Sequence, residues 1–175
     1  MNYTLKQYFS KDECEYIINF CMEFGEIFSY NVNELKSWDC RRIYDEGFKG
    51  NILNKFLSVN TIDSFNIKNI NISLTRYYDD RWLDLHLDST SNYTTVIVLS
   101  DSYSDGRFVL SNSKCEINLA STKLSLGLGE GVTFEGNKIY HGVMPVYSGL
   151  RCALNIWMND TDFVYYKLDK TKKLI

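Results

Sequence analysis

The feature that most constrains the fold is a series of short strand-like segments that begins near residue 71. Each segment is rich in β-branched, aromatic or leucine residues, and Gly, Asn, Asp and Ser separate the segments. The segments are Ile72–Tyr78, Thr94–Ser100, Arg107–Leu110, Lys123–Leu128, Val132–Phe134 and Cys152–Met158. Several short strands at this spacing are typical of an antiparallel barrel or jelly roll. We therefore expect an all-β core from about residue 71 to about residue 160.

The first 70 residues have a helical pattern instead. Ser10 and Glu13 form a capping box, and apolar residues follow at helical spacing as far as Phe24. Residues Ile52–Phe56 predict part of a second helix. The chain has one proline and no Ser/Gly-rich linker, so residues 1–175 are expected to form a single domain. The predicted fold class is mainly β with N-terminal helices (α+β), followed by a short C-terminal tail.

Composition excludes several classes of partner. A formal net charge of −3 argues against a nucleic-acid partner, which normally meets a basic surface. No apolar run approaches the ~18 residues of a membrane span, and Met1–Phe9 lacks the pattern of a signal peptide. The five cysteines include no C-x-x-C pair, which disfavours a disulfide framework or a structural zinc site. Free thiols favour a reducing, cytoplasmic location.

The chain has only two histidines, and both occur in contexts that suit a metal site. His86-Leu87-Asp88 follows an extended segment, and residues i and i+2 of a strand point to the same side. With His141 from a later strand they would form a 2-His-1-carboxylate face, which leaves metal positions open as non-heme iron oxygenases require. Taken alone, an H-x-D pattern is more often an exposed turn or contains a core histidine.

Arg151 is the second candidate for chemistry. It lies ten positions after His141, and two strands joined by a tight turn would place the two residues side by side on the inner face. Strand alternation then puts Asn155 and Trp157 on the same face as Arg151. A guanidinium inside a barrel needs a carboxylate partner. A dicarboxylate cosubstrate or an internal Asp or Glu would supply one.

These motifs together resemble the prolyl 4-hydroxylase-like group of Fe(II)- and 2-oxoglutarate-dependent dioxygenases, over about half of the chain. The matching phrases are Arg76-Tyr77-Tyr78, His86-Leu87-Asp88, Val98-Leu99-Ser100, Gly131-Val132-Thr133-Phe134, His141-Gly142-Val143-Met144-Pro145-Val146 and Gly149-Leu150-Arg151. The resemblance implies a double-stranded β-helix (jelly-roll) core and an oxidoreductase that uses O2, with ascorbate as a candidate reductant. It also implies iron held by His86, Asp88 and His141, and Arg151 on the distal carboxylate of 2-oxoglutarate.

The sequence departs from this family near the mouth of the expected site. Val98 stands where oxygen-sensing relatives have a cosubstrate-binding tyrosine. Tyr77 is therefore expected as the remaining phenolic partner, with Tyr78 as the alternative if the register shifts by one residue. Asn155 is a further candidate contact to the cosubstrate. The family's Gly and Phe before H-x-D are replaced by residues 79–85.

The resemblance runs closest to prolyl 4-hydroxylases, so the expected reaction is hydroxylation of a prolyl residue in a peptide or protein. Trp82, Tyr140 and Trp157 could flank proline rings, and Ser37–Gly50 and Asp79–Leu85 are the candidate substrate loops. The alternatives are hydroxylation of a free amino acid or other small molecule, a non-catalytic jelly-roll module that binds a metal or ligand, and a zinc hydrolase.

Overall fold

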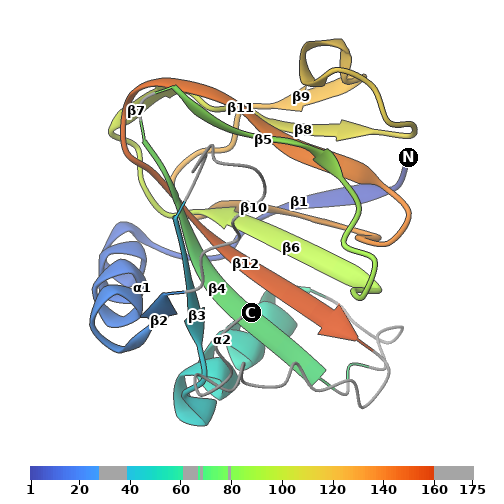
Figure 1. The fold of residues 1–175 in the computed structure, drawn as a ribbon. Coiled ribbons are helices and arrows are strands. Elements are labelled where there is room, and N and C mark those ends of the chain that lie inside the picture. The colour runs from blue at the N-terminus through green and yellow to red at the C-terminus, as the bar shows by residue number, and fades with distance from the viewer. Residues whose placement is uncertain (28–38, 61–66, 68, 79, 160–175) are drawn as a thin grey trace, which may run out of the picture.

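Two antiparallel sheets face each other, and two helices cover the outer side of the larger sheet (Figure 1). The computed structural model describes residues 1–27, 39–60, 67, 69–78 and 80–159. The fold is mainly β with a jelly-roll core, as the sequence predicts. The predicted C-terminal tail, with its basic run from Lys167 to Lys173, lies outside the described residues.

The larger sheet has seven strands in the order β1-β10-β6-β12-β4-β3-β2, and each neighbouring pair is antiparallel. The strands are β1 Tyr3–Gln7, β2 Glu26–Ile27, β3 Asp39–Ile43, β4 Asn69–Tyr77, β6 Tyr93–Val98, β10 Glu130–Phe134 and β12 Arg151–Asn159. One face of the sheet packs on the helices and the other faces the interior between the two sheets.

The smaller sheet has the order β5-β11-β8-β9, and β7 also pairs with β11. Its strands are β5 Arg81–His86, β7 Tyr103–Asp105, β8 Phe108–Ser111, β9 Thr122–Leu124 and β11 Tyr140–Gly149, with a short 3-10 helix at Ile117–Leu119. Of the predicted strand segment Lys123–Leu128, only Lys123 and Leu124 lie in a strand, because β9 ends at Leu124.

The expectation that His141 and Arg151 lie side by side is wrong. Strand β11, which carries His141, belongs to the smaller sheet, and β12, which begins at Arg151, belongs to the larger one. Gly149 makes this change of sheet possible. Its φ is 85°, and a Cβ there would lie 2.1 Å from the carbonyl oxygen of Ser102. The two side chains therefore come from opposite sheets, and both are buried.

Both predicted helices are present, as α1 Lys11–Phe24 and α2 Glu46–Val59. The Ser10 side chain accepts from the Glu13 N–H and the Glu13 carboxylate accepts from the Ser10 N–H, which completes the predicted capping box. Buried apolar side chains attach the helices to the sheet. They are Cys14, Ile17, Cys21, Phe48, Ile52 and Phe56 from the helices and Ile72, Leu74, Leu154 and Ile156 from β4 and β12. No helix in the described ranges is long and apolar enough to cross a membrane.

Several strands lie where the sequence predicts none. β1, β2 and β3 fall in the part expected to be helical, β5 occupies most of the expected loop Asp79–Leu85, and β7 lies between two predicted strands. Within the other expected loop, Ser37–Gly50, β3 and the start of α2 are formed, while residues 37 and 38 lie outside the described chain. β1 is exposed along its whole length, so backbone pairing with β10 and not an alternating pattern defines it.

Candidate metal and cosubstrate site

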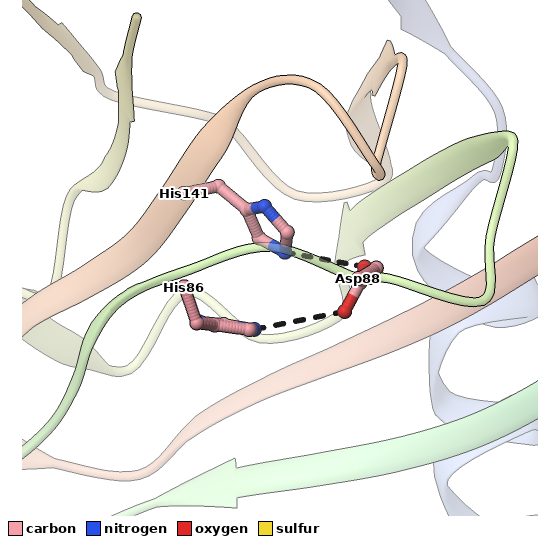
Figure 2. Close-up of side chains that lie close together, drawn as sticks. All are labelled: His86, Asp88 and His141. Atoms are coloured by element: carbon pink, nitrogen blue, oxygen red, sulfur yellow. Dashed lines mark ion pairs between the residues drawn. The ribbon is translucent and has the colours of Figure 1, made fainter. Parts of the chain in front are cut away.

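His86, Asp88 and His141 converge on one point between the sheets (Figure 2). His86 is the last residue of β5 and lies directly opposite His141 of β11, with ring centroids 4.3 Å apart. One ligand atom from each of the three residues lies within 4.8 Å of the others. Ligands bound to one ion at about 2.1 Å and at right angles are about 3 Å apart, so small side-chain adjustments suffice to hold a metal.

Asp88 lies just beyond the end of β5, in the turn that leads to β6. Its N–H donates to the Gly136 carbonyl at 2.9 Å, and its own carbonyl accepts from the Ser91 N–H at 2.9 Å. Its Oδ2 accepts from the Thr94 hydroxyl at 2.7 Å and from the Trp157 indole N–H at 2.9 Å. The position of the carboxylate is therefore set by the backbone hydrogen bonds of the turn and by these two side-chain donors. Strand alternation alone does not determine it.

The second ring nitrogen of each histidine faces a backbone carbonyl. His86 Nδ1 is 2.9 Å from the Asp84 oxygen, and His141 Nδ1 is 3.0 Å from the Ile139 oxygen. A carbonyl can only accept, so Nδ1 carries the proton in both rings and Nε2 offers its lone pair. The two Nε2 atoms face Asp88, at 3.7 Å from Oδ1 and 3.2 Å from Oδ2 (Figure 2). A lone pair that faces a carboxylate repels it unless a cation lies between them, either a metal ion or a proton on Nε2.

The pKa shifts favour the protonation states that bind a metal. Burial raises the pKa of Asp88, but the hydrogen bond and charge of His141, the charge of His86 and the Thr94 hydroxyl outweigh it and bring this pKa to about 2. Burial, together with the charge of His141, lowers the pKa of His86. At neutral pH the carboxylate is ionised and His86 is neutral.

Arg151 is buried in the interior with its charge unmatched. The residue is 1% exposed, and none of its three guanidinium nitrogens has a hydrogen-bond partner in the described part of the chain. Its guanidinium carbon lies 5.4 Å from the centre of the Tyr77 ring, and a Cβ on Gly106 would come within 2.9 Å of its Cδ. The internal ion pair considered from the sequence is not formed with any described residue. Such a group is suited to an anionic ligand with a planar carboxylate.

Tyr77, and not Tyr78, lies beside Arg151. Tyr77 is directly opposite Arg151 in the β4–β12 pairing and is 2% exposed, whereas Tyr78 is 41% exposed and its hydroxyl donates to Asp39. Burial raises the pKa of Tyr77 to about 12, which keeps its hydroxyl protonated and able to donate. Asn155 is buried on the same face of β12 as Arg151, and its amide donates to the Thr75 hydroxyl at 3.0 Å.

The three aromatic residues expected to flank a substrate are not gathered at one place. Trp157 is at the site, where its indole N–H contacts Asp88. Tyr140 packs on the opposite face of the smaller sheet, against the cluster formed by Leu85, Val109, Ala120 and Met144, so it does not line the site. Trp82 is half-buried in β5 and adjoins Leu83, whose side chain packs on the interior cluster.

Sequence reasoning missed Thr94 and Gly136. Thr94 is one of two adjacent threonines in a predicted strand, and nothing in the sequence distinguishes it from Thr95. A Cβ on Gly136 would lie 2.2 Å from the Thr94 Oγ1 and 3.2 Å from the Asp88 Cβ, so a glycine is needed there for the close approach of these residues. Only the folded structure brings Asp88, Thr94 and Gly136 together.

No family model matches the sequence, and the search of curated proteins finds no match either. Solved structures nevertheless resemble this one along almost the whole chain. A Pseudomonas putida prolyl-4-hydroxylase aligns with a TM-score of 0.70 and 13% identity, over 91% of this chain and 92% of that chain. The fold is that of the 2-oxoglutarate oxygenases. A 2OG-Fe(II) oxygenase family oxidoreductase from Burkholderia pseudomallei aligns with a TM-score of 0.67 and 14% identity, over 91% of this chain and 86% of that chain.

A third solved structure with this fold contains a peptide. It is a prolyl hydroxylase from Trichoplax adhaerens in complex with a peptide fragment of the hypoxia-inducible factor oxygen degradation domain. It aligns with a TM-score of 0.67 and 13% identity, over 90% of this chain and 83% of that chain. The resemblance seen in the sequence motifs is thus confirmed at the level of the fold. At these identities the chemistry of this chain has to be argued from its own side chains.

Proposed function

We propose that this protein is an Fe(II)- and 2-oxoglutarate-dependent dioxygenase. His86, Asp88 and His141 would hold the iron, and Arg151 would bind the distal carboxylate of 2-oxoglutarate. The observation that carries the proposal is the buried Arg151 guanidinium without a partner among the described residues, in the same interior as a His-Asp-His cluster. A purely structural metal site would not need this unmatched cation, but an enzyme that binds a dicarboxylate does.

Each group of the site has a separate task in this proposal. His86, Asp88 and His141 would supply three ligands to the metal, which would leave positions for the cosubstrate and O2. When bound, the iron supplies activation of O2 coupled to oxidative decarboxylation of 2-oxoglutarate to succinate and CO2. Arg151 would grip the distal carboxylate with its planar fork, and the Tyr77 hydroxyl would donate to the cosubstrate. Asn155 is a third contact, and ascorbate is the candidate reductant that keeps the iron reduced.

The interior next to the triad is apolar, which suits chemistry that must exclude water. Phe134 lies 4.7 Å from the His141 ring, centre to centre, and Phe108 lies 6.0 Å from it. Val96, Val132 and Val143 continue the same cluster. An apolar wall that excludes water strengthens the electrostatic interactions of the charged groups that face it. It would also protect a reactive centre from side reactions.

For the substrate we propose a prolyl residue in a peptide or protein. Two of the three solved structures described above are named as prolyl hydroxylases, and one of them is in complex with a peptide. The indole N–H of Trp157 donates to Asp88, which places the ring beside the metal cluster, where it would contact an apolar substrate group in this proposal. An extended proline-rich segment is nearly ordered before binding, which lowers the entropic cost of binding in an open groove.

The experiment is incubation of iron-loaded protein with proline-rich peptides, free proline and free amino acids, followed by mass spectrometry. The expected result is a gain of one oxygen on a prolyl residue that requires 2-oxoglutarate and is absent with His141→Ala. Oxygen found only on free amino acids or on non-prolyl residues would overturn the prolyl assignment and leave the oxygenase assignment in place. Binding of metal and ligand without any consumption of 2-oxoglutarate would favour a non-catalytic module.

A further inference from the structure

The Asp88 carboxylate is held from one side by two donors that come from the larger sheet. The Thr94 hydroxyl on β6 and the Trp157 indole N–H on β12 both donate to Oδ2, at 2.7 and 2.9 Å. Asp88 itself follows the end strand of the smaller sheet. Gly136 has no side chain, and this allows its segment to approach both Thr94 and Asp88 closely.

These two donors limit the way in which the Asp88 carboxylate can bind a metal. A carboxylate oxygen has two lone pairs, and the Thr94 O–H and the Trp157 N–H take up both on Oδ2, which also lies 3.2 Å from Nε2 of His141. The other oxygen, Oδ1, faces Nε2 of His86 at 3.7 Å. A carboxylate that chelates through both oxygens would occupy one of the positions that a two-point cosubstrate and O2 need.

We propose that Thr94 and Trp157 are positioning residues for the metal centre: they hold Oδ2 of Asp88, so that the carboxylate presents a single oxygen to the ion. This inference rests on the proposed function, because it concerns the metal of that same site. The two residues touch neither metal nor cosubstrate and act through Asp88. They also tie the turn after β5 to the larger sheet, which fixes Asp88 relative to the rest of the site.

The test is titration with Co(II) under anaerobic conditions, followed by the visible absorption of the bound ion, for wild type, Thr94→Val, Trp157→Phe and Thr94→Ser. Valine keeps the shape of threonine without the hydroxyl, and phenylalanine keeps a ring without the N–H. Loss of an outer-shell partner of a metal ligand weakens metal binding about 10–100-fold, so this rise in the Kd for Co(II) is expected for Thr94→Val and for Trp157→Phe. Thr94→Ser retains the hydroxyl and should restore most of the affinity.

Thr95→Val is the matched control. It makes the same substitution at the next residue of β6, where the hydroxyl pairs with that of Thr133 at 2.7 Å and not with Asp88. The Kd for Co(II) and the absorption spectrum should stay at the wild-type values in this variant. A Kd within twofold of wild type in folded Thr94→Val or folded Trp157→Phe would overturn the inference. So would an equal loss of affinity in Thr95→Val, because both losses would then reflect general damage to β6.

The outcomes separate this inference from the proposed function. A wild-type protein that binds Co(II) no better than His141→Ala overturns both. Wild-type binding that is lost in His141→Ala but unaffected by the substitutions at Thr94 and Trp157 overturns only the positioning role. Should Thr94→Val fail to fold, as judged by circular dichroism, Trp157→Phe decides, because it removes the other donor to the same oxygen.

Discussion

Arg151 has the least satisfied side chain of the site, and this sets up a conflict between stability and function at the scale of a single residue. Its three nitrogens are buried without hydrogen-bond partners among the described residues. Burial of an unpaired charge costs free energy unless a partner or a ligand compensates. The ligand-free protein therefore bears a cost that binding of a dicarboxylate would offset.

Replacement of this residue should separate the two effects. Arg151→Met fills much of the same space without a charge, so the ligand-free protein should gain about 1–2 kcal/mol in free energy of unfolding while 2-oxoglutarate binding is lost. Arg151→Lys should bind 2-oxoglutarate more weakly than wild type but better than the methionine variant, because a point charge replaces a planar fork. Denaturant unfolding and calorimetric titration measure the two quantities. A methionine variant that is less stable than wild type would mean that the guanidinium has a structural partner.

At the scale of elements, the sequence predicts well those segments whose pattern is local. The capping box at Ser10 and Glu13 marks the start of α1, and alternation along β12 correctly groups Asn155 and Trp157 on one face. β1 and β3 are not predicted from the sequence, because their pairing partners, β10 and β4, are distant along the chain. The wrong prediction that His141 and Arg151 lie side by side has a similar cause, because the sequence around Gly149 does not show that the chain passes from one sheet to the other there.

Gly142 determines how closely β5 approaches β11. A Cβ there would lie 2.4 Å from the carbonyl oxygen of Leu83, at the irregular part of the pairing that sets His86 opposite His141. Gly142→Ala should therefore push β5 away, lower the free energy of unfolding and weaken Co(II) binding. Gly50→Ala is the matched control, because no atom lies within 4 Å of its added Cβ and Gly50 is inside α2. It should stabilise the protein by about 0.5–1 kcal/mol.

Denaturant unfolding and Co(II) titration of the two alanine variants test this role of Gly142. If Gly142→Ala behaved like Gly50→Ala in both measurements, the close approach of β5 and β11 would not control the site. A loss of metal binding without a loss of stability would place the effect at His86 alone.

At the scale of the whole molecule, the site is assembled from both sheets. His86 and His141 come from the smaller sheet, whereas Thr94, Arg151 and Trp157 come from the larger one. The triad and Arg151 can be predicted from the sequence because each of these residues lies in a short, recognisable motif. The donors to Asp88 and the partner of each histidine Nδ1 could not be predicted, because they arise only when the sheets face each other.

The stability of the metal-free protein should depend on pH through His86. Its pKa is lowered in the folded state, chiefly by burial, so below about pH 6.5 the unfolded chain takes up a proton that the folded protein does not. The free energy of unfolding should therefore fall as the pH drops from 7 towards 5. His86→Gln should reduce this slope, and denaturant unfolding at a series of pH values measures it. An unchanged slope in the variant would show that His86 is not the group responsible.

Calorimetric titration of 2-oxoglutarate into anaerobic, Fe(II)-loaded protein tests the central claim most directly, because it requires no knowledge of the substrate. One equivalent of 2-oxoglutarate should bind when iron is present. Binding should be greatly weakened when iron is omitted or when His141 is replaced by alanine, and also in Arg151→Ala with iron retained. Absence of binding in wild type, or binding of equal strength in all of these samples, would contradict the assignment of this site to iron and 2-oxoglutarate.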